Sequence, residues 1–281
     1  MTLSRSLRSA GYTLLLVAVG LVVVYPLLWL LFSSFKVDNS DIFGSLSFWP
    51  RKWTPEGYLQ GWKGTGQYDF GRFFVNSLAL TLPTVVLTIV SSVVVGYGFA
   101  RFDFPLRKPL FAVMIATLML PGAVLIIPRY ILFTGFGWIN SYWPFIVPAA
   151  FAGSAFFIFL MVQFFRGIPK ELDESAKMDG CSSWRILTHI LLPNAKPAIF
   201  SIGIFQFLWT WNDFFNAMIF INSTEKFPLP LALRMALDTS TAIAWNQVLA
   251  MSLVTILPCV LLFFLAQKYF VEGVATTGLK G

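Results

Sequence analysis

Long apolar runs without charged side chains constrain this chain more than any other feature. Six such runs together contain a single Asp, Glu, Lys, Arg or His residue, Asp213. A helix needs about 20 apolar residues to cross the hydrocarbon core of a bilayer, and helices can do so because they satisfy their own backbone hydrogen bonds. We therefore predict an all-α membrane protein with one transmembrane domain, residues 1–281. The six predicted spans are residues 10–33, 73–100, 109–128, 143–165, 198–221 and 247–266, and we expect the third of them to bend at Pro121-Gly122.

Composition supports a membrane protein and argues against other classes. The chain is 57% hydrophobic and only 12% charged, whereas soluble domains carry about 25% charged residues. The net charge of +7 does not indicate nucleic-acid binding, because the basic residues lie singly between the apolar runs, as interfacial anchors do. Cys181 and Cys259 provide no disulfide framework. The first run is too long for a signal peptide, so we expect it to remain as a mature helix.

The distribution of basic residues predicts the orientation in the membrane. With six spans and both termini in the cytoplasm, twelve of the twenty Lys and Arg residues fall in cytoplasmic segments. The two shorter external loops, 129–142 and 222–246, hold three, and the long external loop, 36–72, holds five. We expect that long loop to lie partly at the interface. The remaining polar segment, 166–197, is then cytoplasmic.

The segment 166–197 carries helix signals although it is polar. Pro169 suits a first helical position, and three acidic residues follow it where the helix dipole favours negative charge. Gly180 supplies a left-handed stop. We expect a short helix there.

A second short helix is predicted in the same segment, from Trp184 to about Leu192. Ser182 or Ser183 can cap its first turn, and Pro193 is expected to end it. A folded helix–turn–helix at a membrane surface is typical of a docking element.

The spacing within this segment resembles a known family. Glu174-Ser175-Ala176, then Gly180 after three residues, Ile190 after nine more, and Leu192-Pro193 resemble the cytoplasmic coupling-loop signature of permease subunits of ATP-binding-cassette importers. Ser175 and Cys181 stand where Ala is usual, and both are compact. The resemblance implies ATPase coupling by Leu172, Glu174, Ser175, Ala176, Met178, Asp179, Gly180, Ile190, Leu192 and Pro193.

Four other stretches resemble the carbohydrate-uptake branch of these permeases. They are residues 96–108 (with Leu106 where Gly is usual), Trp211–Phe214, the Pro-containing 227–231, and the tail, which resembles that of the maltose-type second permease subunit. In that type, the equivalent of 227–231 faces the external binding protein and the tail reaches the ATPase dimer. The resemblance therefore implies a tail contact through Gly278, Lys280 and Gly281.

Asp213 is costly in hydrocarbon unless it faces a cavity or a protein partner. Helical spacing predicts that Trp209, Asn212, Asp213 and Asn216 share one face of the fifth helix. Two interpretations stay open. The four residues line a substrate pathway on which a sugar stacks, or they form hydrogen bonds that pin this helix to a neighbour.

No catalytic centre is visible in the sequence. A phosphate-binding loop of the Gly-x-x-x-x-Gly-Lys-Ser/Thr type is missing, and the single histidine, His189, cannot build a metal cluster or a triad. We predict no catalytic residues, no metal and no cofactor in this chain, with ATP and Mg²⁺ on a partner ATPase. A secondary transporter would need coupling-ion residues within the membrane and often internal repeats. The sequence has one lone acid in the predicted spans and no clear repeat, so this class is less favoured.

Taken together, the resemblance implies a permease of the type I importer fold in an ATP-driven carbohydrate importer. Its partners would be a sister permease in a heterodimer, two ATPase subunits and an extracytoplasmic solute-binding protein, in a bacterial inner membrane. A polyol or glycerol-phosphate remains an alternative substrate.

Overall fold

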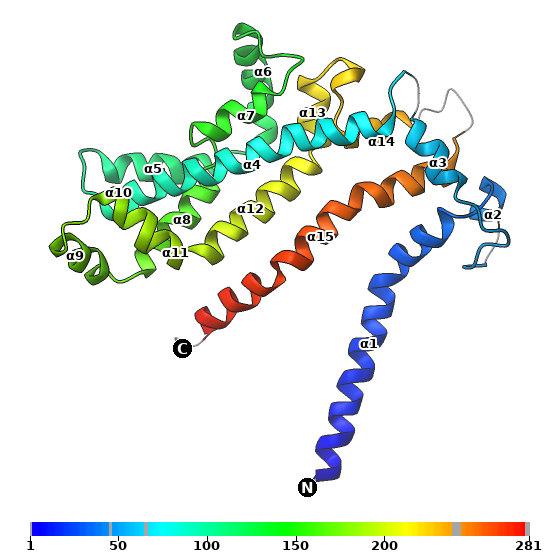
Figure 1. Ribbon diagram of the computed structural model, residues 1–281, viewed down its shortest axis with the longest axis horizontal. Coiled ribbons are helices and arrows are strands. Elements are labelled where there is room, and N and C mark those ends of the chain that lie inside the picture. The colour runs from blue at the N-terminus through cyan, green and yellow to red at the C-terminus, as the bar shows by residue number, and fades with distance from the viewer. Residues whose placement is uncertain (1, 45–46, 65–66, 238–242, 279–281) are drawn as a thin grey trace. The chain divides into compact units, whose positions relative to one another are not determined.

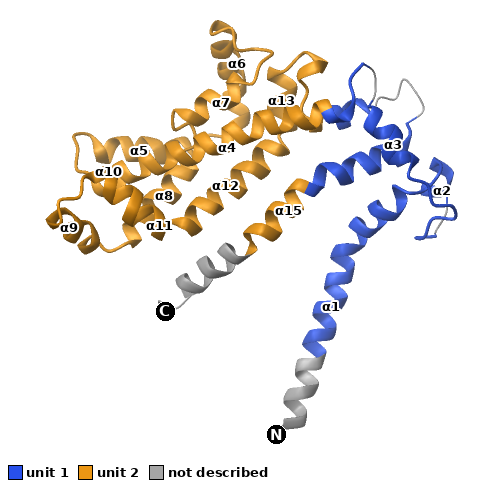
Figure 2. Cartoon of the chain, viewed as in Figure 1, with its two compact units in different colours: residues 1–71, 232–257 blue, residues 72–231, 258–281 orange. Residues whose placement is uncertain are grey.

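The computed structural model describes residues 2–44, 47–64, 67–237 and 243–278, with side-chain surroundings from residue 11 to 267 inside those ranges. Every regular element of the described part is helical (Figure 1), which confirms the predicted all-α class. The chain divides into two compact units (Figure 2), one of Met1–Gly71 with Ala232–Leu257 and one of Arg72–Leu231 with Pro258–Gly281.

The first unit contains α1 (Thr2–Ser33), α2 (Asn39–Phe43) and α3 (Glu56–Lys63). Side chains 11–27 of α1 are all exposed although nearly all of them are apolar. Such a helix needs lipid or another subunit around it, as the predicted first span requires. Pro26 lies within α1, and the helix continues past it to Ser33.

The segment after α1 is folded rather than a loose linker. The rings of Phe35 and Trp53 lie 5.3 Å apart between centroids. Lys36 is fully buried, and its ammonium group donates hydrogen bonds to the backbone carbonyls of Asp41 (2.9 Å) and Ser47 (3.0 Å). A buried charge needs such partners, so this segment has a defined structure around α2.

Most other helices belong to the second unit. They are α4 (Phe70–Arg101, apart from its first two residues), α5 (Arg107–Thr117), α6 (Ile126–Gly135), α7 (Trp143–Ala150), α8 (Ala155–Gly167), α9 (Glu171–Met178), α10 (Ser183–Ile186), α11 (Leu192–Asn194), α12 (Lys196–Trp211) and α13 (Phe214–Phe220). Two helices contribute to both units, α14 (Leu229–Met235) and α15 (Trp245–Gly278).

The core of the second unit lies where α4, α8 and α12 meet. Phe157, Met161 and Phe165 of α8 are fully buried there, together with Ile202 of α12. Because lipid tails are as apolar as these side chains, their contribution inside a membrane comes from close van der Waals packing between the helices. Gly96 lets α4 approach closely, since a Cβ at that position would lie 2.7 Å from the Cβ of Met161. The result is a closely packed scaffold for the segment 166–197.

Four helices are long and apolar enough to cross a membrane, and two strongly bent helix pairs raise the number to six. One pair, α5 with the residues 122–135, bends by 100°. The break falls at Pro121 and Gly122, as the sequence predicts. Residues 129–135 of the predicted external loop 129–142 are helical, because α6 continues to Gly135.

The predicted fourth span contains a break between α7 and α8 that the sequence does not reveal. Ala152 adopts a left-handed conformation (φ 61°), and the N–H of Gly153 donates to the carbonyl of Pro148 (2.8 Å). The chain therefore turns at 151–154 before helix resumes.

The prediction of one continuous helix over 198–221 is wrong. The helix α12 ends at Trp211, and Asp213 is the N-cap of a new helix, α13. The Asp213 carboxylate accepts a hydrogen bond from the backbone N–H of Asn216 (3.0 Å). A capping carboxylate satisfies an otherwise unpaired N–H at a helix start, which explains how an acid is accommodated here.

Candidate functional site

The segment predicted to couple the permease to an ATPase begins with α9, at the end of the second unit where α4 ends (Figure 1). Gly180 ends this helix, with φ +77°. The N–H of Cys181 donates to the carbonyl of Ala176 (2.9 Å), and the N–H of Gly180 donates to that of Lys177 (3.0 Å). These two bonds form a Schellman motif, so the predicted left-handed stop is confirmed. Pro169 lies just before the N-cap, Lys170, instead of at the first helical position.

The second helical stretch starts as predicted and ends later than predicted. Ser182 caps α10 by accepting a hydrogen bond from the N–H of Arg185 (3.3 Å). A π-helical turn, η2 (Leu187–Leu191), follows and leads into α11. Pro193 was expected to end the helix, but it lies inside α11. A proline inside a helix removes one backbone hydrogen bond, and Pro193 lies just after the π-helical turn, where the regular hydrogen-bond pattern of the helix already changes.

The two faces of α9 have different surroundings. Asp173 and Ala176 point inward and are buried. Met178 is 89% exposed and Leu172 is 45% exposed, so both apolar side chains are accessible to a partner. The outward-facing positions among the predicted coupling residues are Leu172, Glu174, Ser175, Met178, Asp179 and Gly180.

The remaining predicted coupling residues divide between core and surface. Ile190 and Leu192 are half-buried and pack against the core of the second unit, whereas Pro193 is exposed. Ile190 and Leu192 therefore anchor the segment to the core, and α9 carries most of the exposed positions.

A buried ion pair ties α9 to α4. The Nε atom of Arg101, at the end of α4, lies 2.6 Å from Oδ2 of Asp173, and the two side chains are only 5% and 9% exposed. The contact is a charge pair without hydrogen-bond alignment at Nε. Arg101 also donates from Nη2 to the carbonyl of Ile168 (2.8 Å). The side chain of Arg101 therefore contacts Ile168, which precedes α9, and Asp173 in the first turn of α9.

A second link joins α4 to α10. The Tyr97 hydroxyl donates to the carbonyl of Ser183 at 3.0 Å. Tyr97 lies one turn before Arg101, so adjacent turns of α4 hold both halves of the segment 166–197. Sequence reasoning missed the Arg101–Asp173 pair, because each residue fits a local explanation, an interfacial cation and a first-turn acid.

A cavity of about 190 Å³ lies beside the break between α12 and α13. Trp209 and Asp213 line it, as the substrate-pathway interpretation requires, together with Arg129 of α6 and Gln206 of α12. Buried threonine hydroxyls of α4, at Thr84 and Thr88, also face it. Aromatic, amide, hydroxyl and charged groups thus share one small space.

Two of the four residues predicted for this site do not line the cavity. The helix break turns Asn212 away, and its side-chain amide donates to the carbonyl of Leu208 (2.8 Å). The Asn216 amide donates to both carboxylate oxygens of Asp213, at 3.1 and 2.9 Å. The prediction that all four share one helix face is therefore wrong, and Asn216 supports Asp213 from behind.

Arg129 is the main residue of this cavity that sequence reasoning missed. It was assigned to an external turn, whereas it lies in α6. Its guanidinium carbon lies 5.6 Å from the ring centroids of both Phe133 and Phe220. Cation–π contacts of this kind hold a guanidinium in an apolar environment. A lone arginine directly after an apolar run gives no signal of such a location.

The tail residues lie at the limit of the structure. Gly278 is the last residue of α15, whereas Lys280 and Gly281 lie outside the described residues. No group of three or more His, Cys, Asp or Glu that could hold a metal occurs in the described part of the chain. His189 is exposed, with Nδ1 2.8 Å from the Thr188 hydroxyl.

Comparisons with known proteins identify the family of this chain. Residues 92–276 match the family described as "Binding-protein-dependent transport system inner membrane component". The probable ABC transporter permease protein YurM of Bacillus subtilis is 36% identical over 93% of this chain and 85% of its own length. The arabinooligosaccharides transport system permease protein AraQ of the same organism is 33% identical over 98% of this chain and 97% of its own.

The galactooligosaccharides transport system permease protein GanQ of Bacillus subtilis is 30% identical over 100% of this chain and 99% of its own. Among solved structures, a chain of a bacterial ABC transporter involved in the import of the acidic polysaccharide alginate superposes with a TM-score of 0.82 at 22% identity, covering 95% of this chain and 98% of that one. At that identity the likeness shows a shared fold. The family resemblance predicted from the coupling segment is thus confirmed, and the chain belongs to the inner membrane components of binding-protein-dependent transport systems.

Proposed function

We propose that this chain is the permease subunit of an ATP-driven carbohydrate importer and forms half of its translocation pathway. Full-length similarity to permeases named for arabino- and galactooligosaccharide transport supports the carbohydrate class. The same comparisons do not favour the polyol, glycerol-phosphate or secondary-transporter alternatives. The single observation that carries the mechanism is the buried Arg101–Asp173 pair, which joins the cytoplasmic segment to a membrane helix.

ATP hydrolysis takes place on separate subunits in this proposal. The outward face of α9 meets an ATPase, with Leu172 and Met178 as apolar anchors and with Glu174 and Asp179 facing basic groups. When the ATPases close, α9 moves as a rigid body. Because Arg101 and Tyr97 hold the segment to α4, that movement reaches the membrane helices and switches access between the two sides.

The cavity beside α13 is the proposed contact with the transported solute. Its hydroxyl, amide and charged groups offer hydrogen-bond partners to sugar hydroxyls, and the exposed Trp209 offers a ring on which a pyranose face can stack. Interhelical pinning is the competing interpretation. A solute contact is supported because Trp209 and Asp213 both line the cavity, and Trp209 is still 51% exposed although its ring also packs against Phe157 of α8 (5.0 Å between centroids).

A sister permease, two ATPases and an extracytoplasmic solute-binding protein complete the proposed importer. The family description itself names a dependence on a binding protein and an inner membrane location. The excess of Lys and Arg in the proposed cytoplasmic segments supports placing both termini in the cytoplasm. The tail, with Gly278, Lys280 and Gly281, is proposed as a second ATPase contact.

Reconstitution tests this function. The chain, co-expressed with its sister permease and ATPase subunits, should co-purify with the ATPase. Proteoliposomes containing the complex should take up an oligosaccharide only with ATP inside and binding protein outside. Uptake driven by an ion gradient without ATP would show a secondary transporter, and ATP-dependent uptake of glycerol phosphate but no sugar would restore the alternative substrate.

A further inference from the structure

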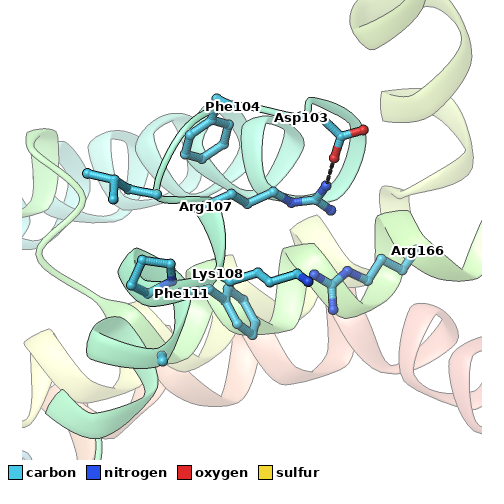
Figure 3. A pocket seen from close by; sticks show the side chains of 9 residues that line it. Asp103, Phe104, Arg107, Lys108, Phe111 and Arg166 are labelled. Carbon is cyan, nitrogen blue, oxygen red and sulfur yellow. Dashed lines mark hydrogen bonds and ion pairs between the residues drawn. The ribbon is translucent and has the colours of Figure 1, made fainter.

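A second cavity, of about 670 Å³, lies between the loop that follows α4 and the end of α8 (Figure 3). Its volume falls within the range of small-molecule sites, about 300–1,000 Å³. Arg107 is the first residue of α5, and Arg166 is next to last in α8. Both helices belong to candidate membrane spans, and side chains at the ends of such spans lie at the level of lipid headgroups.

The charges around this cavity do not balance. Three cationic side chains line it, at Arg107, Lys108 and Arg166, against one carboxylate, Asp103. Arg107 is already engaged, because it forms an ion pair with Asp103 and donates from Nε to the carbonyl of Phe99 (3.1 Å). Within the described chain, the side chains of Lys108 and Arg166 form no hydrogen bond and no ion pair.

Lys108 and Arg166 also face one another. Figure 3 shows both side chains extending from opposite sides toward the region above the ring of Phe111. The Arg166 guanidinium carbon lies 5.1 Å from that ring centroid, so the ring holds it in this direction. Like charges directed at one another repel, and an anion between them would turn the repulsion into two attractions.

The rim of the cavity is apolar. Phe104 and Leu106 line its edge with exposed side chains, and Leu110 and Val113 continue an exposed apolar surface along α5. Leu106 holds its side chain outward from a left-handed backbone conformation (φ 65°), which is uncommon for a residue with a Cβ. A free anion needs only the cations, whereas a lipid uses both the cations and the apolar surface beside them.

We propose that this cavity binds the headgroup of an anionic glycerophospholipid, with the phosphate between Lys108 and Arg166 and the acyl chains along the exposed side of α5. Basic pockets between membrane helices recognise such headgroups. The bound lipid would hold the first turn of α5 in place, and only residues 102–106 separate that turn from Arg101 at the end of α4. Placing this lipid in the cytoplasmic leaflet rests on the proposed orientation of the chain, whereas the contact between lipid and cavity does not.

Native mass spectrometry of the full-length chain in detergent tests this, with phosphatidylglycerol and phosphatidylcholine of equal chain length as probes. We expect one tightly bound phosphatidylglycerol and an affinity about tenfold above that for phosphatidylcholine. The double variant K108Q/R166Q should lose this preference. The charge-retaining variant K108R/R166K should keep it, and so should K63Q/K196Q, which removes two exposed cations elsewhere.

Melting temperatures of all variants in phosphatidylcholine-containing detergent identify any folding defect, and R166Q alone then serves as the milder variant. Equal binding of the two lipids by the natural chain would overturn the proposal. So would an equal loss in K63Q/K196Q, or displacement of the lipid by millimolar inorganic phosphate, which would indicate a site for a soluble anion. Protection of the cavity by the ATPase in the assembled importer, with no lipid bound there, would identify a protein contact and also overturn it.

Discussion

Two places in the second unit set an arginine and an aspartate in apolar surroundings, and they use the pair differently. At the coupling segment, Arg101 and Asp173 touch at 2.6 Å and are almost fully buried. At the cavity beside α13, Arg129 and Asp213 line the same space without forming an ion pair. There the arginine lies on two phenylalanine rings and the aspartate caps a helix.

The difference fits the two proposed roles, a mechanical connection at the first place and a binding surface at the second. A closed pair that is almost fully buried is shielded from solutes, and breaking it leaves an uncompensated charge. It therefore resists separation of the two helices it joins. An open pair keeps polar groups directed into a cavity, where a solute can meet them. The four predictions below test each half of this comparison, starting with the largest effect.

Breaking the closed pair should cost the most stability. Asp173→Leu leaves the Arg101 charge buried without a partner, so the free energy of unfolding should fall by about 3–5 kcal/mol. The double variant R101M/D173L removes both charges and should recover most of that loss. Unfolding of the purified chain in mixed detergent measures both. Glu174→Gln, an exposed neighbour on α9, is the control and should stay within about 0.5 kcal/mol. A similar loss in that control would refute a special role for the pair.

The outward face of α9 should behave in the opposite way. Met178→Glu and Glu174→Lys should each lower stability by at most about 1 kcal/mol, since both side chains are exposed and only the helix dipole opposes the new charges. They should reduce binding-protein-stimulated ATP hydrolysis in the reconstituted importer by about tenfold, a typical effect of losing an interface anchor. Met178→Leu keeps an apolar anchor and should preserve coupling. Full stimulation in both disruptive variants would place the ATPase contact elsewhere.

At the open pair, charge and capping can be separated. Asn caps helices about as well as Asp, so Asp213→Asn should keep α13 stable and yet lower sugar uptake by about tenfold, through loss of a charged hydrogen-bond partner. Asp213→Ala should lower uptake similarly and also cost about 1 kcal/mol of stability through the lost cap. Transport assays beside unfolding measurements distinguish these outcomes. Dissociation of the permease pair by both variants would favour interhelical pinning.

We expect the smallest effects for substitutions at residues with a left-handed backbone conformation. Gly180→Ala should destabilise by about 1 kcal/mol, because a Cβ there meets no atom within 4 Å and only the backbone conformation (φ +77°) is strained. Gly167 has equally open space without a positive φ, so Gly167→Ala should be neutral or slightly stabilising. Leu106→Gly should stabilise by about 1 kcal/mol, because it relieves the left-handed leucine. Thermal unfolding of the three variants side by side checks the order.

Much of this fold could be predicted from short-range patterns in the sequence. The apolar runs predict the helices, Pro121-Gly122 predicts the bend between α5 and α6, and Gly180 and Ser182 predict the turn within the coupling segment. Each works because a few neighbouring atoms decide the outcome, such as a missing Cβ, a missing N–H or a capping hydroxyl.

The features that were missed depend on distant residues or on competing local rules. Arg101 and Asp173 lie far apart in the chain and meet only after α4 and α8 have packed. Asp213 was treated as a charge inside a helix because its apolar neighbours continue on both sides. An Asp followed by an apolar helical run is also an N-cap signal, and that reading would have predicted the break. Arg129 enters the cavity only because α6 bends back from α5.

Site-specific cross-linking of the assembled importer tests the central claim most directly. A photoreactive amino acid replaces Met178 on the outward face of α9, and a matched variant carries it at Phe200, an exposed position on α12. We predict a cross-link to the ATPase subunit from position 178 and none from position 200. ATPase cross-links from position 200 but not from position 178, or a cross-link from position 178 to the solute-binding protein, would contradict the proposed coupling surface.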